Sequence, residues 1–252
     1  MRRNIRLDIE YEGTDFSGWQ RQGNRPTIQA VLEDAVAIVL NRRVTLYGAS
    51  RTDAGVHAAG QVANFYLEAR DPCFGAEKWR VILNQMLPGS IRITGSSSVS
   101  QAFHAQRGVV SKRYSFRILH REYPSALDRR VFFYPHRLDW KAIDEALPML
   151  VGKKDFKAFQ VQGGQRRTTE REITRIERRA EAPDLWRFEI EGTGFLKQMI
   201  RSLMGTLVEI GEGKRKPGDI PLILASRCRS RAGRTLPPAG LCLESVRYSS
   251  DL

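Results

Sequence analysis

Apolar and polar residues alternate at the start of the chain, which predicts a half-buried strand over 5–11. A helix then begins at Pro26-Thr27, because the following apolar residues repeat on one helical face. After this helix we expect two short strands, a helix ended by Pro88-Gly89, and a further strand; they cover 44–47, 61–66, 79–87 and 91–99. The first part of the chain therefore mixes strands and helices.

The second part repeats this order of elements approximately. It predicts strands over 112–119, 131–134, 171–179, 185–191 and 241–248, and helices over 140–151, over 195–210 and near Leu222. These elements indicate an α+β fold of two similar halves, 1–105 and 106–252. We expect a mixed, largely antiparallel sheet with helices packed on it and a central cleft where the halves meet.

The predicted helix over 195–210 has one strongly apolar stripe, which buries that face. Arg201 lies nearly opposite the stripe, and Gly205 follows one turn later on the same side. A glycine inside a helix costs about 1 kcal/mol relative to alanine and marks a close approach by another segment. Arg201 is therefore either a solvated residue or part of a packed, functional face.

One carboxylate stands in a short loop between the strands over 44–47 and 61–66. The loop runs from Gly48 to Ala58 and carries Asp53, with Arg51 two residues before it and His57 four residues after it. Gly48 and Gly55 permit backbone angles closed to other residues. An aspartate between glycines commonly forms a turn, but this loop also offers a cation and a titratable ring.

Composition points to an acidic partner. Lys plus Arg number 41 against 28 Asp plus Glu, giving a formal net charge of +13 and a pI near 10.1, as expected of a nucleic-acid-binding protein. The basic residues cluster in three places: Arg171, Arg175, Arg178 and Arg179; Lys214, Arg215 and Lys216; and Arg227, Arg229, Arg231 and Arg234. For the run Lys214–Lys216 a solvated face is the better interpretation than direct recognition.

The cysteines and the N-terminal residues indicate the compartment in which the protein works. Cys73, Cys228 and Cys242 are odd in number and far apart, which favours reduced thiols over disulfides or a zinc site. No apolar signal segment precedes the first strand, and no apolar run is long enough to span a bilayer. We expect a cytoplasmic protein without metal or membrane association.

Several stretches resemble the tRNA pseudouridine synthase A family. The Gly48–Ala58 loop resembles its catalytic loop, which usually has Gly where this chain has Ser50. Further likeness, in the family's order, lies in Tyr11, Gly13, Thr14 and Gly18-Trp19-Gln20; in Ser111–Phe116; in Gly192–Leu196, Met199–Arg201 and Gly205–Leu207; and in Gly233, Thr235, Pro237 and Gly240-Leu241. The family commonly has Arg and an aromatic near Gln106 and Arg107. The resemblance covers nearly the whole chain.

The resemblance implies an isomerase of the pseudouridine synthase fold that converts uridine to pseudouridine at positions 38, 39 and 40 of the tRNA anticodon stem-loop. It implies Asp53 as nucleophile, Arg201 as its partner, Arg51 and His57 as substrate-binding residues, and Tyr114 as an aromatic platform for the base. On residue pattern alone Tyr114 is a core residue, because it alternates with Phe116 and Ile118. The resemblance also implies a homodimer in which both protomers hold one tRNA, and no cofactor.

Two other functions fit the residues. His57 and His104 could act as an acid and base pair in metal-free RNA cleavage. A non-enzymatic RNA-binding module would need the charge alone.

Overall fold

The computed structural model describes residues 3–163 and 168–249. It contains two compact units, Met1–Val110 with Cys242–Leu252, and Ser111–Leu241. The predicted halves, 1–105 and 106–252, differ from these units because they place the last strand in the second half. That strand, β10 (Leu241–Tyr248), groups with the first unit because it pairs in parallel with β3 (His57–Leu67). The predicted α+β class is confirmed, and within the described residues no helix could cross a membrane.

The sheet of the first unit is centred on β1 (Arg3–Tyr11), which pairs antiparallel with β3 and with β4 (Ile91–Val99). Its strand order is β4–β1–β3–β10, and the two-residue strand β2 (Tyr47–Gly48) pairs with β3. The predicted alternation of β1 is confirmed, because its odd-numbered apolar side chains Ile5, Leu7 and Ile9 are buried.

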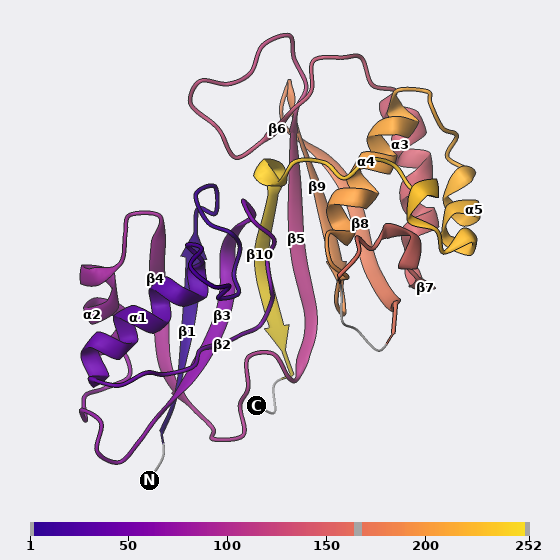
Figure 1. Cartoon of the computed structure of the whole chain (residues 1–252). Coiled ribbons are helices and arrows are strands. Elements are labelled where there is room, and N and C mark those ends of the chain that lie inside the picture. Colours follow the sequence, from indigo (N-terminus) through magenta and orange to yellow (C-terminus); the bar gives the residue numbers. More distant parts are fainter. Residues whose placement is uncertain (1–2, 164–167, 250–252) are drawn as a thin grey trace. The chain divides into compact units, whose positions relative to one another are not determined.

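Two helices pack on this sheet, α1 (Ile28–Leu40) and α2 (Lys78–Met86) (Figure 1). The predicted start of α1 is confirmed, since the Thr27 hydroxyl accepts the Ala30 N–H at 3.3 Å as an N-cap. Trp79 anchors α2, with its ring 5.0 Å from the ring centroids of both Phe65 and Phe74. These contacts fix the helices to the sheet that carries the Asp53 loop.

The sheet of the second unit has the order β5–β9–β8–β7, all antiparallel. These strands are β5 (Val109–Leu119), β7 (Gly152–Asp155), β8 (Glu170–Ala182) and β9 (Leu185–Gly192), and the short β6 (Phe132–Phe133) pairs in parallel with β5. Phe116 lies opposite Phe188, and both are fully buried. This pair marks the core face of the sheet.

The helices of the second unit are α3 (Trp140–Ala146), α4 (Met199–Gly211) and α5 (Asp219–Ser226). Short 3₁₀ turns η1, η2, η3 and η4 cover Leu147–Leu150, Lys157–Phe159, Arg229–Arg231 and Pro238–Gly240. Helices α3 and α4 lie side by side (Figure 1). Helix α4 begins at Met199 rather than at the predicted Phe195, because Gln198 adopts the left-handed conformation with φ 56°.

Candidate active site

The Asp53 loop connects β2 to β3. Asp53 is half-buried, Arg51 is exposed, and the side chains between and before them, Thr52 and Ser50, are buried. The loop closes with a hydrogen bond from the Val56 N–H to the Asp53 carbonyl at 3.2 Å. Gly55 has φ 77°, so its predicted need for an unusual backbone angle is confirmed. The loop thus presents Asp53 and Arg51 on a short, fixed turn.

A second loop supports this turn from behind. The Trp19 N–H donates to the Thr52 carbonyl at 3.1 Å, and the Gly55 N–H donates to the Phe16 carbonyl at 3.1 Å. Gly18, with φ 91°, approaches so closely that a Cβ there would lie 2.6 Å from the Thr52 carbonyl oxygen. Backbone hydrogen bonds on both sides of Asp53 therefore hold its position.

Gly48 has a different role from the one predicted. Its φ lies outside the left-handed region, so the expected need for an unusual angle is wrong. Instead, a Cβ at Gly48 would overlap the indole ring of Trp19, which is only 2% exposed. The glycine is required because a large ring lies directly on the backbone. The sequence motif Gly18-Trp19 and the glycine that opens the Asp53 loop are thus one packing unit.

A buried glutamine holds the other side of the loop. Gln61 Oε1 accepts the Ser50 N–H at 3.1 Å, while Gln61 Nε2 donates to the Ser50 carbonyl at 2.7 Å. The Tyr11 hydroxyl lies 2.7 Å from Thr52 Oγ1 and 3.4 Å from Gln61 Nε2. These bonds satisfy the polar backbone groups of a buried segment that belongs to no strand. Ser50, where the resembling family has Gly, is accommodated in this arrangement.

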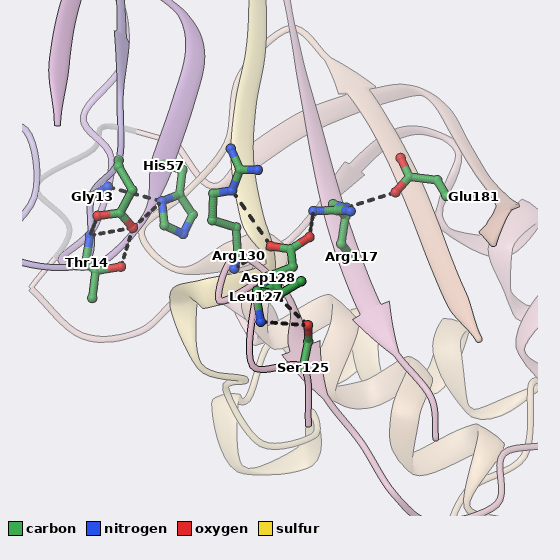
Figure 2. A network of polar contacts seen from close by, with 10 residues as sticks. Gly13, Thr14, His57, Arg117, Ser125, Leu127, Asp128, Arg130 and Glu181 are labelled. Atoms are coloured by element: carbon green, nitrogen blue, oxygen red, sulfur yellow. Dashed lines mark hydrogen bonds and ion pairs between the residues drawn. The ribbon is translucent and has the colours of Figure 1, made fainter. Parts of the chain in front are cut away.

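His57 is 4% exposed at the start of β3 and binds the loop after β1. Figure 2 shows Gly13 and Thr14 beside it; the Gly13 N–H donates to His57 Nδ1 at 3.1 Å. Glu12 Oε1 lies 3.2 Å from the same nitrogen, which cannot both accept an amide proton and donate one. The buried Gly13 N–H needs an acceptor more than the partly exposed Glu12 carboxylate needs a donor, so we assign Nδ1 as the acceptor and place the ring proton on Nε2. His57 therefore holds the loop that supports Asp53.

The two histidines considered for RNA cleavage lie far apart. The ring of His104 packs on Tyr47, with 4.7 Å between centroids, and Tyr47 pairs with Asn64 on β3. From His57 to Asn64 the strand advances about 23 Å at roughly 3.3 Å per residue. Burial, together with nearby Arg107, lowers the pKa of His104. No single substrate atom can reach both rings, so the cleavage hypothesis is not supported.

Tyr114 and Arg201 belong to the second unit. Tyr114 is 6% exposed on β5, and its ring meets the ring of Phe195 edge-on, with 5.2 Å between centroids and an interplanar angle of 82°. Phe195 also approaches Gly192, where a Cβ would lie 3.2 Å from its ring. The aromatic pair thus connects β5 to the segment that leads into α4.

Arg201 is half-buried near the start of α4. Its Nε donates to the Leu236 carbonyl at 2.7 Å, and the Leu236 N–H donates to the Arg201 carbonyl at 3.2 Å. The expectation for Gly205 is confirmed, because a Cβ there would overlap the Arg234 carbonyl oxygen. The face of α4 opposite the apolar stripe is therefore covered by the segment 232–236, and Arg201 is not a solvated residue.

Much of the clustered positive charge is locally neutralised. Arg178 forms a bidentate pair with Asp144, and Arg179 pairs with Glu189 at 2.9 Å. In the second cluster, Lys214 pairs with Glu212 and Arg215 pairs with Glu209. On strand β5, Arg117 bonds both Asp128 and Glu181 (Figure 2). Sequence clustering alone therefore overstates how much charge these segments offer a partner.

Comparison with known proteins gives a match over most of the chain. The family model described as tRNA pseudouridine synthase matches residues 9–106 and 146–249, which include the Asp53 loop and α4. Among solved structures, the chain is similar to the archaeal box H/ACA sRNP Nop10-Cbf5 complex, with a TM-score of 0.32 and 13% identity over 81% of this chain and 54% of that chain. A likeness of that size carries no argument about function.

Similar curated proteins cover both chains almost completely. One from Acetivibrio thermocellus, tRNA pseudouridine synthase A, is 43% identical over 98% of this chain and 100% of its own length. Another from Clostridium perfringens, tRNA pseudouridine synthase A 2, is 42% identical with the same coverage. A third from Myxococcus xanthus, tRNA pseudouridine synthase A, is 41% identical over 97% of this chain and 91% of its own length. The chain belongs to the tRNA pseudouridine synthase family of isomerases.

Proposed function

We propose that the protein converts uridine to pseudouridine at positions 38, 39 and 40 of the tRNA anticodon stem-loop, with Asp53 as the nucleophile. One observation carries the assignment of Asp53: its loop is bonded on one side by Trp19 and Phe16 and on the other by Gln61. Such support fixes a carboxylate more firmly than a simple turn requires. A chain of this family with a carboxylate held in this way is equipped for this isomerisation.

The reaction breaks the bond between uracil N1 and ribose C1′, turns the base, and forms a bond between C5 and C1′. The proton on C5 leaves to solvent and N1 gains a proton, so no redox partner or metal is consumed. Asp53 starts the sequence as a carboxylate, by attack on C1′ or by removal of a ribose proton. In both cases the ionised form is the active one.

We propose that Arg201 keeps the Asp53 carboxylate ionised. Expelling water would raise the pKa of an aspartate, whereas an adjacent arginine typically lowers it by ~1–3 units. Arg201 already has its Nε bonded to Leu236, which orients the guanidinium plane. We propose that the Arg201 guanidinium pairs with Asp53.

Tyr114 and Arg51 act on the nucleotide. Tyr114, held edge-on by Phe195, offers its ring as the platform on which the extruded base stacks. Extruding a base from a stem costs a few kcal/mol, and exposed Arg51 fills the vacated space. His57 holds the loop after β1 through the Gly13 N–H, which donates to its Nδ1, and its part in substrate binding stays a prediction.

The proposed partners are one tRNA and a second copy of the chain, with both protomers holding the same tRNA. The proposed place of action is the cytoplasm. Sedimentation of the protein with and without tRNA tests the homodimer, since a monomer under both conditions would contradict it.

Asp53→Asn tests the nucleophile. The substitution keeps the size and turn-forming capacity of the side chain but removes its charge, so melting and tRNA binding stay near wild type while pseudouridine formation falls below detection. Tritium release from tRNA labelled at uridine C5 measures the reaction, and mass spectrometry excludes deamidation back to aspartate. Asp15→Asn, an exposed aspartate in the same unit, is the matched control and retains activity.

The outcomes separate the hypotheses. Measurable turnover by undeamidated Asp53→Asn would contradict the assignment, because it leaves the loop without a carboxylate. Loss of folding and activity together would support the turn-former interpretation instead.

A further inference from the structure

Arg229 has neutral oxygen partners inside its own unit. It lies in the 3₁₀ turn η3 and is half-buried. Its Nη1 donates to the Gly233 carbonyl at 2.8 Å and to the Ala232 carbonyl at 3.4 Å, and its Nη2 donates to Thr235 Oγ1 at 2.7 Å. The sequence groups it with Arg227, Arg231 and Arg234 as a basic cluster, yet these three bonds turn its guanidinium toward the segment 232–236.

That segment lies along α4 and is joined to it by a row of hydrogen bonds. The Gly233 N–H donates to Thr206 Oγ1 at 2.8 Å, and Thr206 in turn donates to the Ser202 carbonyl at 3.0 Å. The hydroxyls of Ser202 and Thr235 lie 3.2 Å apart. Thr235 therefore bonds both Arg229 and the helix, and it connects η3 to α4.

The spacing between segment and helix is set by two glycines that face each other. A Cβ at Gly233 would lie 2.7 Å from the Thr206 Cα and 2.9 Å from the Gly205 carbonyl carbon. A Cβ at Gly205 would overlap the Arg234 carbonyl. Because the backbones touch directly, a shift of the segment is transmitted to its end, where the Leu236 carbonyl accepts the Arg201 Nε–H at 2.7 Å.

We propose that Arg229 is a positioning residue for Arg201: by holding the segment 232–236 on α4, it fixes the Leu236 carbonyl and so the direction of the Arg201 guanidinium. This inference rests on the proposed function, in which Arg201 pairs with the reacting carboxylate. A half-buried arginine is a costly way to fill space, since burial lowers the pKa of Arg229 against the opposing effect of Glu209. Charge-assisted bonds to three oxygens are what the arginine adds.

A double-mutant cycle tests the coupling. Arg229→Gln, Arg201→Lys and the combined variant are assayed for kcat, KM and tRNA affinity. A small displacement of a catalytic group costs up to about 10²-fold, so we expect Arg229→Gln to lower kcat by about tenfold or more with KM and affinity unchanged. In the Arg201→Lys background, Arg229→Gln changes kcat by less than about twofold, because the group it positions is already gone.

Two milder substitutions guard against misfolding. Thr235→Val removes one acceptor of Arg229 and lowers kcat in the same way, while Thr235→Ser keeps the hydroxyl and retains kcat. Arg121→Gln, an exposed arginine bonded to Asp184, is the control and retains wild-type kcat. Hydrogen exchange of the Leu236 amide, which donates to Arg201, gives a readout independent of turnover and quickens in Arg229→Gln and Thr235→Val.

Equal losses of kcat from Arg229→Gln in both backgrounds would overturn the inference, because they would show that Arg229 acts without Arg201. Unchanged Leu236 exchange in both variants would also overturn it. If the wild-type protein forms no pseudouridine, the proposed function fails, whereas the exchange experiment still reports on the contact between the segment and α4.

Discussion

Gln61 replaces a missing strand partner for Ser50: its side-chain amide accepts from the N–H and donates to the carbonyl of the same residue, at 3.1 and 2.7 Å. Both groups are buried, and the loop that carries Asp53 has no ladder to satisfy them. An amide side chain copies the donor and acceptor of a neighbouring backbone unit. The position of the Asp53 loop therefore depends partly on a residue of β3 that lies eight positions after Asp53.

Gln61→Leu leaves the Ser50 N–H and carbonyl buried without these partners. We expect the free energy of unfolding to fall by about 1–3 kcal/mol, measured by urea denaturation, together with a lower kcat because the loop loses its support. Gln85→Leu, an exposed glutamine on α2, is the control and changes stability by less than about 0.5 kcal/mol. Equal stability of the two variants would show that Gln61 does not support the loop.

The sequence predicted the elements whose apolar pattern is regular. Strands β4 and β10 have the predicted bounds, 91–99 and 241–248. The apolar pattern placed the start of helix α4 too early. Leu196 is buried, as a residue on the apolar face of a helix would be, but Gln198 has φ 56° and the helix begins only after it. Strand β7, Gly152–Asp155, was missed because its polar residues show no alternation.

Some residues of the site were also visible in the sequence, whereas others were not. Asp53, Gly55 and Gly205 stand out locally, because a charged loop and a glycine inside a helix are visible in the sequence. Gln61 gave no such signal, since a glutamine in a strand is unremarkable until the fold places it beside Ser50. The indole of Trp19 over Gly48 is likewise a tertiary contact that no spacing rule contains.

Gly205 offers a direct test of the close contact on α4. Gly205→Ala introduces a methyl group where the Arg234 carbonyl lies, so despite the better helix propensity of alanine we expect a loss of at least about 1–3 kcal/mol by urea denaturation. Gly218→Ala is the matched control: nothing lies within 4 Å of a Cβ there, and φ is −63°. It stays neutral or gains up to about 1 kcal/mol. A stabilising Gly205→Ala would contradict the packing described here.

Arg201→Lys separates charge from geometry. Lysine has one nitrogen, so it cannot bond the Leu236 carbonyl and also pair with a carboxylate through a planar fork. We expect kcat to fall on the order of 10²-fold while the melting temperature and tRNA affinity stay near wild type. Near-normal turnover would show that the carboxylate does not depend on the guanidinium.

Asp71 makes part of the stability pH-dependent. Hydrogen bonds from Arg42, with help from the Glu68 N–H, lower its pKa against the opposing effect of burial. An aspartate with a lowered folded-state pKa stabilises the protein above its unfolded pKa of about 3.9, and this contribution is lost as pH falls through the folded value. The difference in unfolding free energy between wild type and Asp71→Asn is therefore largest near neutral pH and shrinks below about pH 3.9. A difference that grows on acidification would contradict this assignment.

Binding to tRNA should depend steeply on salt, but not through the arginines that are already paired. Contact with about 6–10 phosphates weakens binding by ~10³ or more between 50 and 200 mM salt. Arg179→Gln leaves the slope of log Kd against log salt unchanged, because its charge is taken up by Glu189 at 2.9 Å. Arg51→Gln, which removes an exposed cation from the Asp53 loop, lowers the slope by about one. Filter binding across a salt series measures the slope for the wild type and for both variants. A flat wild-type slope would show that the basic residues do not contact phosphate. A reduced slope in Arg179→Gln would show that tRNA displaces Glu189 from Arg179.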